Sequence, residues 1–424
     1  MDRPLGVYIS VPFCKAKCTY CNFASGVFGT ERMDAYVERV RTEIGGLRSF
    51  AAGTGAGVEL PGLVDSIYFG GGTPSLLSAE QMRRLFAALR GEFAVSADAE
   101  VTLECAPGQL AGETLDEMMR QGMNRVSFGV QSFVDAEAKA VGRLHTRDVC
   151  LGEIARMRAA GVGNINVDLI VGLPGQTAAS WLESVEVALE TGVPHVSVYM
   201  LEVDEDSRLG REMLKAEDRE QGTGNRLRYG ADAVASEDEI AEWYGAGCEW
   251  LEAGGVRQYE ISNFAREGFA SRHNEKYWRR EPYVGFGLDA HSMLRSGVGG
   301  VRWANGDDLE QYLACEREQG SGSREQGVGG ELRVLRARPE VEAVREEKAF
   351  EEAWFLGLRM NEGVELEALR AEFGEELTRG AVEALGDVEE AGLVIVEGGR
   401  VKLTVRGRMA SNEVFGRLLV GAAV

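Results

Sequence analysis

A chain of 424 residues, 44% hydrophobic and 27% charged, has the composition of an ordinary globular protein with two or three domains. Its formal net charge of −22 argues against nucleic acid and anionic membrane surfaces as partners, because both are negatively charged. We identify no secretory signal and no apolar run of membrane-spanning length, and the seven cysteines form no disulfide framework. We therefore expect a cytoplasmic protein.

Three cysteines follow the first apolar segment, 6–11, which predicts a strand. Cys14, Cys18 and Cys21 have the spacing C-x3-C-x2-C on one loop. Thiolates are the ligands of iron–sulfur clusters, and three of them leave one iron of a four-iron cluster open. A zinc site needs a fourth ligand at short range, and the nearest histidine is His145. The spacing favours a cluster, and metal analysis would decide between iron and zinc.

Along the chain, apolar segments that predict strands alternate with segments of helical periodicity. The expected strands are 6–11, 65–69, 99–103, 125–130, 164–171 and 195–201, and the expected helices are 31–47, 79–91, 113–121, 147–160 and 178–191. This alternation predicts a parallel sheet. The expected fold is α/β, either an incomplete barrel or an open sheet.

The second half of the chain is less regular. Residues 240–254 predict another helix, and an aromatic-rich stretch, 259–292, follows. Residues 316–331 have a linker's composition. Beyond residue 347, three helices and two β segments, 393–397 and 400–403, predict a winged-helix-like module. The acidic composition favours packing or protein contact over DNA binding for this module.

Polar residues stand where several predicted strands end. The second strand is followed by Gly70-Gly71-Gly72-Thr73, the third ends in Glu104, the fourth in Gln131, and the fifth carries Asp168. Active sites of α/β barrels lie at the carboxyl ends of the strands, so these residues should share a mouth with the cysteines. Glycines allow close approach of a ligand, although a tight turn explains the glycine run equally well.

These motifs resemble those of the radical S-adenosylmethionine (SAM) family. The cysteine motif with Tyr20 before its last cysteine is that family's hallmark, and RVSFGVQSF (125–133) and DLIVGLPGQT (168–177) are similar to its branch that acts on tetrapyrroles. The resemblance implies a partial (β/α)6 barrel whose 4Fe–4S cluster binds SAM and cleaves it reductively to a 5′-deoxyadenosyl radical. It also implies the SAM contacts Tyr8, Gly70, Gly71, Gly72, Thr73, Glu104, Gln131, Arg143 and Asp168.

Two groups of proteins in this branch share these motifs. Oxygen-independent coproporphyrinogen III oxidases have a fourth cysteine where this chain has Phe23. Heme chaperones of the HemW type have phenylalanine there and an H-N-x-x-Y-W motif, which this chain has at residues 273–278. The resemblance therefore implies a carrier that binds heme and delivers it to acceptors such as respiratory enzymes, some of them membrane-bound. The alternative is the oxidase, which removes carboxyl groups from propionates by radical chemistry.

The residues of the H-N-x-x-Y-W motif also suit heme on chemical grounds. Imidazole is the commonest heme ligand, so His273 is the expected ligand, with Tyr277 and Trp278 as flat apolar surface. The basic side chains available to heme propionates are Arg272, Lys276, Arg279 and Arg280. The alternative is a hydrogen-bonded structural histidine among packed aromatics. His291 is the second candidate ligand, whereas His145 and His195 are expected to be structural.

We expect four segments in total. These are a core barrel over 1–210, a region carrying the heme motif over 211–315, a linker over 316–346 and the winged-helix-like module over 347–424. Cys105, Cys150, Cys248 and Cys315 have no partner at ligand spacing and are expected to be small hydrophobic residues.

Overall fold

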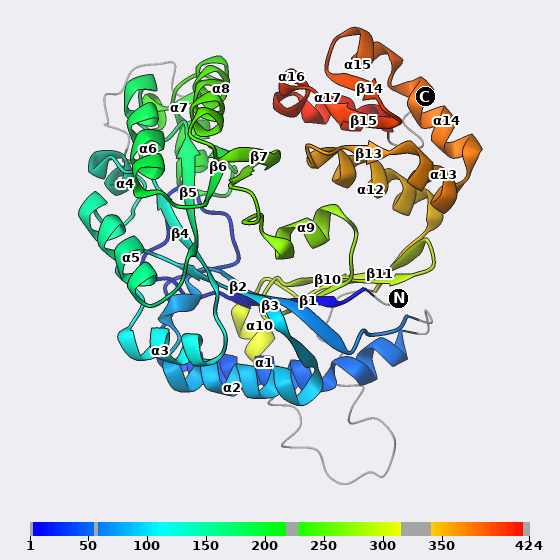
Figure 1. Cartoon of the computed structure of the whole chain (residues 1–424). Coiled ribbons are helices and arrows are strands. Elements are labelled where there is room, and N and C mark those ends of the chain that lie inside the picture. The colour runs from blue at the N-terminus through cyan, green and yellow to red at the C-terminus, as the bar shows by residue number, and fades with distance from the viewer. Residues whose placement is uncertain (1–2, 55–57, 218–227, 315–340, 419–424) are drawn as a thin grey trace.

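The computed structural model describes residues 3–54, 58–217, 228–314 and 341–418. Six parallel strands alternate with helices, which confirms the predicted partial barrel (Figure 1). In chain order these elements are β1 (Leu5–Val11), α1 (Glu31–Gly53), β2 (Leu63–Gly71), α2 (Ala79–Glu92), β3 (Ala94–Cys105), α3 (Gly112–Arg120), β4 (Arg125–Gln131), α4 (Asp135–Ala140), α5 (Arg147–Ala159), β5 (Asn164–Val171), α6 (Ala178–Thr191) and β6 (His195–Met200).

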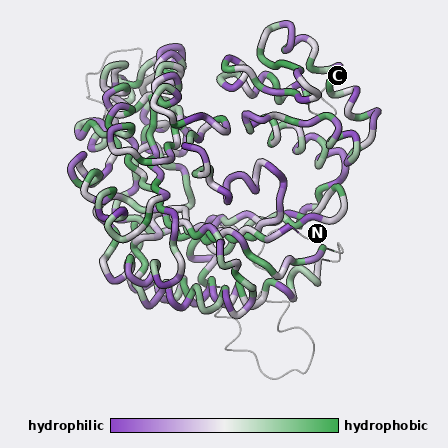
Figure 2. Tube along the Cα trace, viewed as in Figure 1, coloured by the Kyte–Doolittle hydropathy of each residue, from purple (hydrophilic) through white to green (hydrophobic). Residues whose placement is uncertain are grey.

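The six strands are apolar on the face that the helices cover and polar on the inner face. On β1, Val7 and Ile9 are fully buried in the core between sheet and helices, whereas Tyr8 faces inward. The register places Tyr8 beside Tyr68 of β2, and Tyr68 beside Thr102 of β3. Because side chains alternate along a strand, every second residue of a strand faces the core. Figure 2 shows hydrophobic and hydrophilic residues interspersed along the trace of the sheet. A polar inner surface results, and the site is built on it.

Both edges of this parallel sheet are extended by strands for which the sequence analysis assigned no elements. Next to β1 lie β9 (Tyr283–Phe286), β10 (His291–Ser296), β11 (Gly299–Ala304) and β12 (Glu342–Val344). Next to β6 lie β8 (Asn263–Ala265) and β7 (Arg257–Glu260). The helices of this region are α7 (Arg208–Glu217), α8 (Glu237–Ala253), α9 (Arg272–Trp278) and α10 (Leu309–Ala314). The residues of the heme motif thus belong to a helix, α9, that lies over the inner face of the sheet.

The C-terminal module has a core of its own and a three-stranded sheet in the order β13-β15-β14. It comprises α12 (Glu346–Arg359), β13 (Val364–Glu365), α13 (Leu366–Phe373), α14 (Glu375–Ala384), α15 (Gly386–Glu390), β14 (Val394–Glu397), β15 (Arg400–Leu403), α16 (Val405–Met409) and α17 (Ser411–Phe415). This arrangement agrees with the winged-helix-like expectation. Most of the expected linker lies outside the described residues, and so does Cys315, which immediately precedes it.

The module packs against the barrel through its first helix. The backbone N–H of Ile261 donates to the carbonyl of Arg359 over 3.1 Å, and the N–H of Asn361 donates to the carbonyl of Tyr259 over 2.9 Å. Helix α9 lies between the sheet and α12 (Figure 1). In the part of the chain that the structure describes, no helix is long and apolar enough to span a membrane.

Candidate functional site

The cysteine loop runs from the end of β1 across the carboxyl edge of the sheet. Backbone hydrogen bonds close its base, from the N–H of Cys14 to the carbonyl of Gly26 and from the N–H of Gly26 to the carbonyl of Pro12, both 2.9 Å. Cys18 is buried, and Cys14 and Cys21 are half-buried. The three thiols therefore face the barrel mouth from a loop whose ends are fixed by the sheet.

Each thiol has its own polar neighbour. The hydroxyl of Thr73 donates to Sγ of Cys14 over 3.7 Å, and Nη1 of Arg143 donates to Sγ of Cys18 over 3.5 Å. Sγ of Cys21 lies 3.9 Å from the hydroxyl of Ser25. Burial raises the pKa of Cys14. Hydrogen-bond donors and a guanidinium beside the sulfurs are suited to thiolates that carry a cluster.

The three thiols are neighbours on the loop, and no group of three or more His, Cys, Asp or Glu side chains among the described residues is placed to hold a single metal ion. In a four-iron cluster each thiolate binds a different iron, so the ligands surround the cluster. Three thiols with hydrogen-bond donors beside them have the chemistry that such a cluster requires.

The glycine run lies directly beneath the cysteine loop. Gly71 has φ +103°, a conformation that L side chains rarely adopt. A Cβ on Gly72 would lie 2.9 Å from Sγ of Cys14 and 2.9 Å from the carbonyl oxygen of Phe13, and one on Gly70 would lie 2.8 Å from the ring of Tyr8. The run therefore makes room for the cysteine loop, which a simple tight turn would not require.

Two half-buried carboxyl groups project from the strands below the loop. Glu104 accepts a hydrogen bond from the hydroxyl of Tyr68 over 2.8 Å, and burial together with nearby Asp168 raises its pKa to about 7. Asp168 accepts from Ser127 over 3.2 Å and from Asn166 over 2.7 Å, and burial raises its pKa as well. Such paired carboxyl groups at strand ends are suited to bind a cationic or hydroxyl-bearing ligand.

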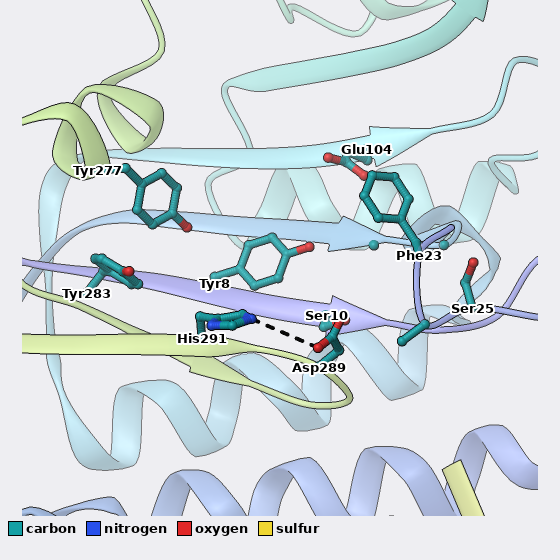
Figure 3. A pocket seen from close by; sticks show the side chains of 12 residues that line it. Tyr8, Ser10, Phe23, Ser25, Glu104, Tyr277, Tyr283, Asp289 and His291 are labelled. Atoms are coloured by element: carbon teal, nitrogen blue, oxygen red, sulfur yellow. Dashed lines mark ion pairs between the residues drawn. The ribbon is translucent and has the colours of Figure 1, made fainter. Parts of the chain in front are cut away.

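A cavity of about 330 Å³ opens beside these groups. Its walls come from β1, the cysteine loop, the glycine run, β3, α9, β9 and the turn before β10 (Figure 3). The lining residues are Tyr8, Ser10, Phe23, Ala24, Ser25, Gly71, Gly72, Glu104, Tyr277, Tyr283, Asp289 and His291. The cavity thus joins four residues expected to contact SAM with one residue of the expected heme motif.

The other expected SAM contacts surround the cavity without lining it. Thr73 and Arg143 contact the cysteine sulfurs, and Asp168 projects from β5 and accepts a hydrogen bond from Ser127 of β4. Gln131 ends β4 with φ +71°, a backbone conformation that is strained for a non-glycine residue and often found at functional sites. The structure therefore brings the predicted SAM contacts to one end of the sheet, some of them lining the cavity and others beside it.

Comparison with known proteins identifies the family. Residues 8–188 match the Radical SAM superfamily, and residues 344–410 match the HemN C-terminal domain. The chain is 33% identical to the heme chaperone HemW of Bacillus subtilis over 97% of this chain and 98% of that protein, and 31% identical to that of Lactococcus lactis over 99% and 98%. The chain belongs to the heme chaperone HemW family.

The fold has a solved counterpart. Coproporphyrinogen III oxidase (HemN) from Escherichia coli, a radical SAM enzyme, is similar with a TM-score of 0.77 and 22% identity over 99% of this chain and 91% of that one. This likeness shows the fold. Together with the superfamily match, the cysteine loop assigns a 4Fe–4S cluster and SAM as cofactors.

In this member of the HemW family, the three predicted heme residues point in three directions. His273 is 1% exposed, with Nδ1 3.0 Å from the hydroxyl of Ser66 and Nε2 2.8 Å from the hydroxyl of Tyr277. Tyr277 lines the cavity. Trp278 faces the C-terminal module, where the guanidinium of Arg359 lies 4.2 Å from its ring centroid. Of the three, only Tyr277 lines the cavity.

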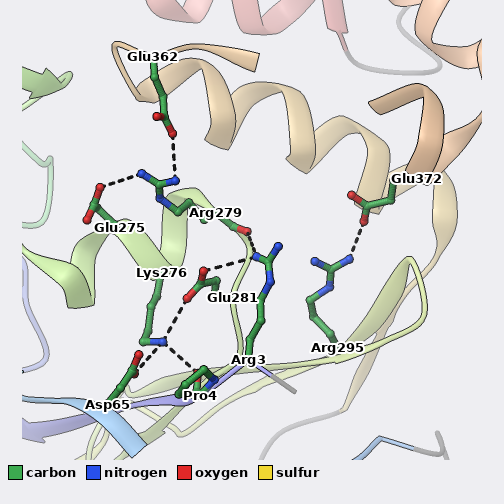
Figure 4. Close-up of polar contacts among 10 residues, drawn as sticks. All are labelled: Arg3, Pro4, Asp65, Glu275, Lys276, Arg279, Glu281, Arg295, Glu362 and Glu372. Carbon is green, nitrogen blue, oxygen red and sulfur yellow. Dashed lines mark hydrogen bonds and ion pairs between the residues drawn. The ribbon is translucent and has the colours of Figure 1, made fainter. Parts of the chain in front are cut away.

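The basic residues around the motif form ion pairs within the protein, and Figure 4 shows those of Lys276 and Arg279. Lys276 bonds to Asp65 over 2.8 Å and to Glu281 over 3.2 Å. The remaining ion pairs join Arg279 to Glu362 at 3.1 Å, Arg280 to Glu372 at 3.2 Å and Arg272 to Asp98 at 3.8 Å. The structure therefore does not present these four cations to heme propionates, because they tie α9 to the sheet and to the C-terminal module.

The remaining histidines divide into buried and exposed. His145 is hydrogen-bonded to the carbonyl of Val130 over 3.1 Å, and burial lowers its pKa to about 4. His195 is fully buried between Asn166 and Tyr259. His291 has a side chain that is 66% exposed at the cavity rim, 3.9 Å from Asp289. His145 and His195 thus have the structural setting expected for them, and His291 is accessible to a ligand.

Sequence reasoning did not identify several side chains of the site. Tyr68 forms a hydrogen bond with Glu104, and Ser66 lies within hydrogen-bonding distance of His273. Tyr283 packs edge-on against Tyr277, with 4.5 Å between the ring centroids. The polar alternation along each strand was the available signal for Ser66 and Tyr68. No comparable signal exists for Tyr283, because its position depends on β9 joining the sheet beside β1.

Proposed function

We propose that the chain binds heme in the cavity between the cysteine loop and α9 and transfers it to heme-accepting proteins. One observation carries the proposal: the cavity has an aromatic wall of Tyr8, Tyr277 and Tyr283, with accessible His291 at its rim. Aromatic rings provide the flat surface that a porphyrin needs, and the polar rim leaves room for the propionates. Relatives that share almost the whole chain are named heme chaperones.

The cluster and SAM occupy the adjoining part of the same mouth. Cys14, Cys18 and Cys21 would hold the cluster, with Thr73 and Arg143 donating to two of the sulfurs. When bound, the cluster supplies an electron to SAM. The polar groups of SAM would be bound by residues at the strand ends, the glycine backbone holding its amino acid part and the carboxyl groups its cationic and hydroxyl groups. These residues are Gly70, Gly71, Gly72, Glu104, Gln131 and Asp168.

The three residues of the heme motif contribute to this site in different ways. Tyr277 forms part of the cavity wall, and His273 supports it from the core side through their hydrogen bond. Trp278 anchors α9 to the C-terminal module through Arg359. The motif would thus build the wall and fix its position.

The proposed carrier is cytoplasmic and delivers heme to acceptors such as respiratory enzymes. Some of these acceptors are membrane-bound, and the carrier would contact them transiently. The acidic surface, with a net charge of −22, favours protein partners over nucleic acid. Respiratory acceptors, membrane contact and location in the cytoplasm are part of the proposal.

The fold also suits a coproporphyrinogen III oxidase, given its likeness to HemN. Phe23 favours the carrier, because a large exposed ring at the cavity edge replaces the fourth cysteine of the oxidases. The assay that distinguishes the two is incubation of reconstituted protein with coproporphyrinogen III, SAM and dithionite. We expect no loss of substrate carboxyl groups, and turnover would favour the oxidase.

A heme titration of anaerobically reconstituted protein tests the carrier directly. We expect a saturable Soret band, and transfer of the heme to an apo-protein acceptor such as apomyoglobin. Tyr8→Ala should weaken binding because it removes part of the cavity wall, whereas Tyr229→Ala, which changes a tyrosine that does not line the cavity, should not. Absence of saturable binding in the unaltered protein would refute the proposal.

A further inference from the structure

The turn before β10 is held by two buried side chains of α1. The carboxylate of Glu43 accepts hydrogen bonds from the backbone N–H of Gly287 over 3.1 Å and from Nδ2 of Asn305 over 2.7 Å. The hydroxyl of Tyr36 accepts a hydrogen bond from the N–H of Leu288 over 2.8 Å. All five residues are buried, and a buried polar group that loses its partner is costly. The network therefore fixes the turn.

Asp289 is the next residue of this turn, and its backbone is strained. Its φ is +55°, a left-handed conformation that is uncommon for residues other than glycine. The N–H of Asp289 donates to the carbonyl of Gly306 over 3.0 Å, and the N–H of Asn305 donates to the carbonyl of Ala290 over 3.0 Å. Such a conformation persists where the surrounding structure enforces it. The turn thus holds the side chain of Asp289 in the cavity wall.

The carboxylate of Asp289 is available to a ligand. Its side chain is 48% exposed, and its one ion-pair partner in the described part of the chain is His291, 3.9 Å away (Figure 3). An exposed pair at this distance is weak, and an imidazole is charged only when it is protonated. Partial burial raises the pKa of Asp289, because it removes water from the carboxylate. A positive charge in the cavity would therefore stabilise the ionised form of Asp289.

The charges on the cavity wall favour a cationic ligand. Glu104 and Asp289 are the two acidic residues among the described residues that line the cavity, and none of those residues is lysine or arginine. Figure 3 shows the two carboxyl groups on opposite sides of Tyr8. Burial and the charges of both groups raise the pKa of Tyr8, so both groups act on the space beside its hydroxyl. A positive charge in this space would be stabilised from two sides.

SAM has such a charge on its sulfur, whereas S-adenosylhomocysteine lacks the methyl group and has an uncharged sulfur. We propose that Asp289 is a specificity-determining residue that favours SAM over S-adenosylhomocysteine, and that Glu43 and Tyr36 are its positioning residues. The inference rests on the SAM site of the proposed function and deepens it. Glu104 is less suited to this role, because it already accepts a hydrogen bond from Tyr68 and, with a pKa of about 7, is only partly ionised at neutral pH.

The test is calorimetric titration of the anaerobically reconstituted full chain with SAM and with S-adenosylhomocysteine. In Asp289→Asn the affinity for SAM should fall by about tenfold, as expected when a nearby opposite charge is removed, and the affinity for S-adenosylhomocysteine should not change. Asp307→Asn is the matched control, because it removes an exposed carboxylate that does not line the cavity, and it should keep both affinities. An equal loss for both ligands in Asp289→Asn, or no loss for either, would overturn the proposal.

The positioning role has its own measurement. The carboxylate of Glu43 accepts hydrogen bonds from three donors, so the amide of Glu43→Gln cannot satisfy all of them. The preference for SAM should fall as in Asp289→Asn, with no further fall when both substitutions are combined. Tyr36→Phe, which removes the hydroxyl and keeps the ring, should lower the preference in the same direction. The ratio of the two affinities does not depend on the amount of folded protein, so it distinguishes positioning from stability.

Two results would refute the positioning role. These are an unchanged ratio of affinities in both Glu43→Gln and Tyr36→Phe, and a further fall of the ratio in the double variant of Glu43 and Asp289. Absence of saturable SAM binding in the unaltered reconstituted protein is a different result, and it would refute the SAM site of the proposed function instead.

Discussion

The two halves of the site are built in opposite ways. The cysteine loop takes its three thiols from eight consecutive residues, 14–21, and hydrogen bonds at its base fix it on β1. The cavity takes its wall from the cysteine loop, the glycine run and β3 as well as from β1, α9, β9 and the turn before β10, and most of these segments are far apart in the sequence. The loop is thus a local structure, whereas the cavity depends on how α9 and the edge strands pack. Substitutions should therefore affect the two halves separately.

The largest effect we expect is on the local half. Cys18→Ser should abolish the visible absorbance of the reconstituted cluster, because it removes a thiolate ligand. Heme binding should remain measurable, since Cys18 does not line the cavity. The control is Cys248→Ser, a half-buried cysteine on α8, which should keep its full iron and sulfide content. If heme binding disappeared together with the cluster, the two halves would not be separate.

A second substitution tests how tightly the glycine run supports the loop. Gly72→Ala should reduce cluster content strongly, because its Cβ would lie 2.9 Å from Sγ of Cys14 and from the carbonyl of Phe13. Iron and sulfide analysis after reconstitution measures the effect. Gly91→Ala on α2 is the matched control, since no atom lies within 4 Å of the added Cβ. Equal cluster content in both variants would show that the loop tolerates displacement.

A third substitution tests the half of the site that depends on the packing of α9. Arg359 pairs at 3.5 Å with Glu260, whose side chain is fully buried, and stacks on Trp278. Arg359→Ala should lower the free energy of unfolding by about 3 kcal/mol, because it leaves a buried carboxylate without its partner. Cluster absorbance should not change.

Chemical denaturation measures this effect. Arg379→Ala removes an exposed pair with Glu383 and should cost less than about 0.5 kcal/mol, the usual value for such pairs. Similar losses in the two variants would mean that the contact between α9 and the C-terminal module contributes little.

The smallest effect concerns Glu104, which lies where the two halves meet. Its pKa of about 7 means that it is ionised above pH 7 and protonated below. A cationic ligand such as SAM favours the carboxylate, so the affinity should fall by up to about tenfold for each pH unit below 7 and level off above it. Calorimetric titration with SAM measures this, and Glu104→Gln should remove the pH dependence. The same slope in that variant would assign the effect to another group.

Much of the fold could be predicted because its signals are local and repeated. Each core strand pairs a buried apolar row with a polar row, as in Val7 and Ile9 beside Tyr8, and amphipathic helices separate the strands. The strands of the second half could not be assigned in this way. β9 is four residues long and joins β1 across about 270 residues of sequence, so no local pattern marks its partner.

The cysteine motif shows what the sequence alone determined. The spacing of Cys14, Cys18 and Cys21 predicted the cluster site, because one short loop can present three thiolates without help from distant residues. The order of strands and helices predicted a parallel α/β sheet and left open whether it forms a partial barrel.

The heme motif shows what only the tertiary structure decided. The sequence places His273, Tyr277 and Trp278 within one short motif, but it predicts neither the helix they form nor which of them faces the ligand. Packing of α9 between the sheet and the C-terminal module turns His273 to Ser66, Trp278 to Arg359 and Tyr277 to the cavity. The physical reason is that the direction of a helix face depends on its neighbours, and here those neighbours come from both ends of the chain.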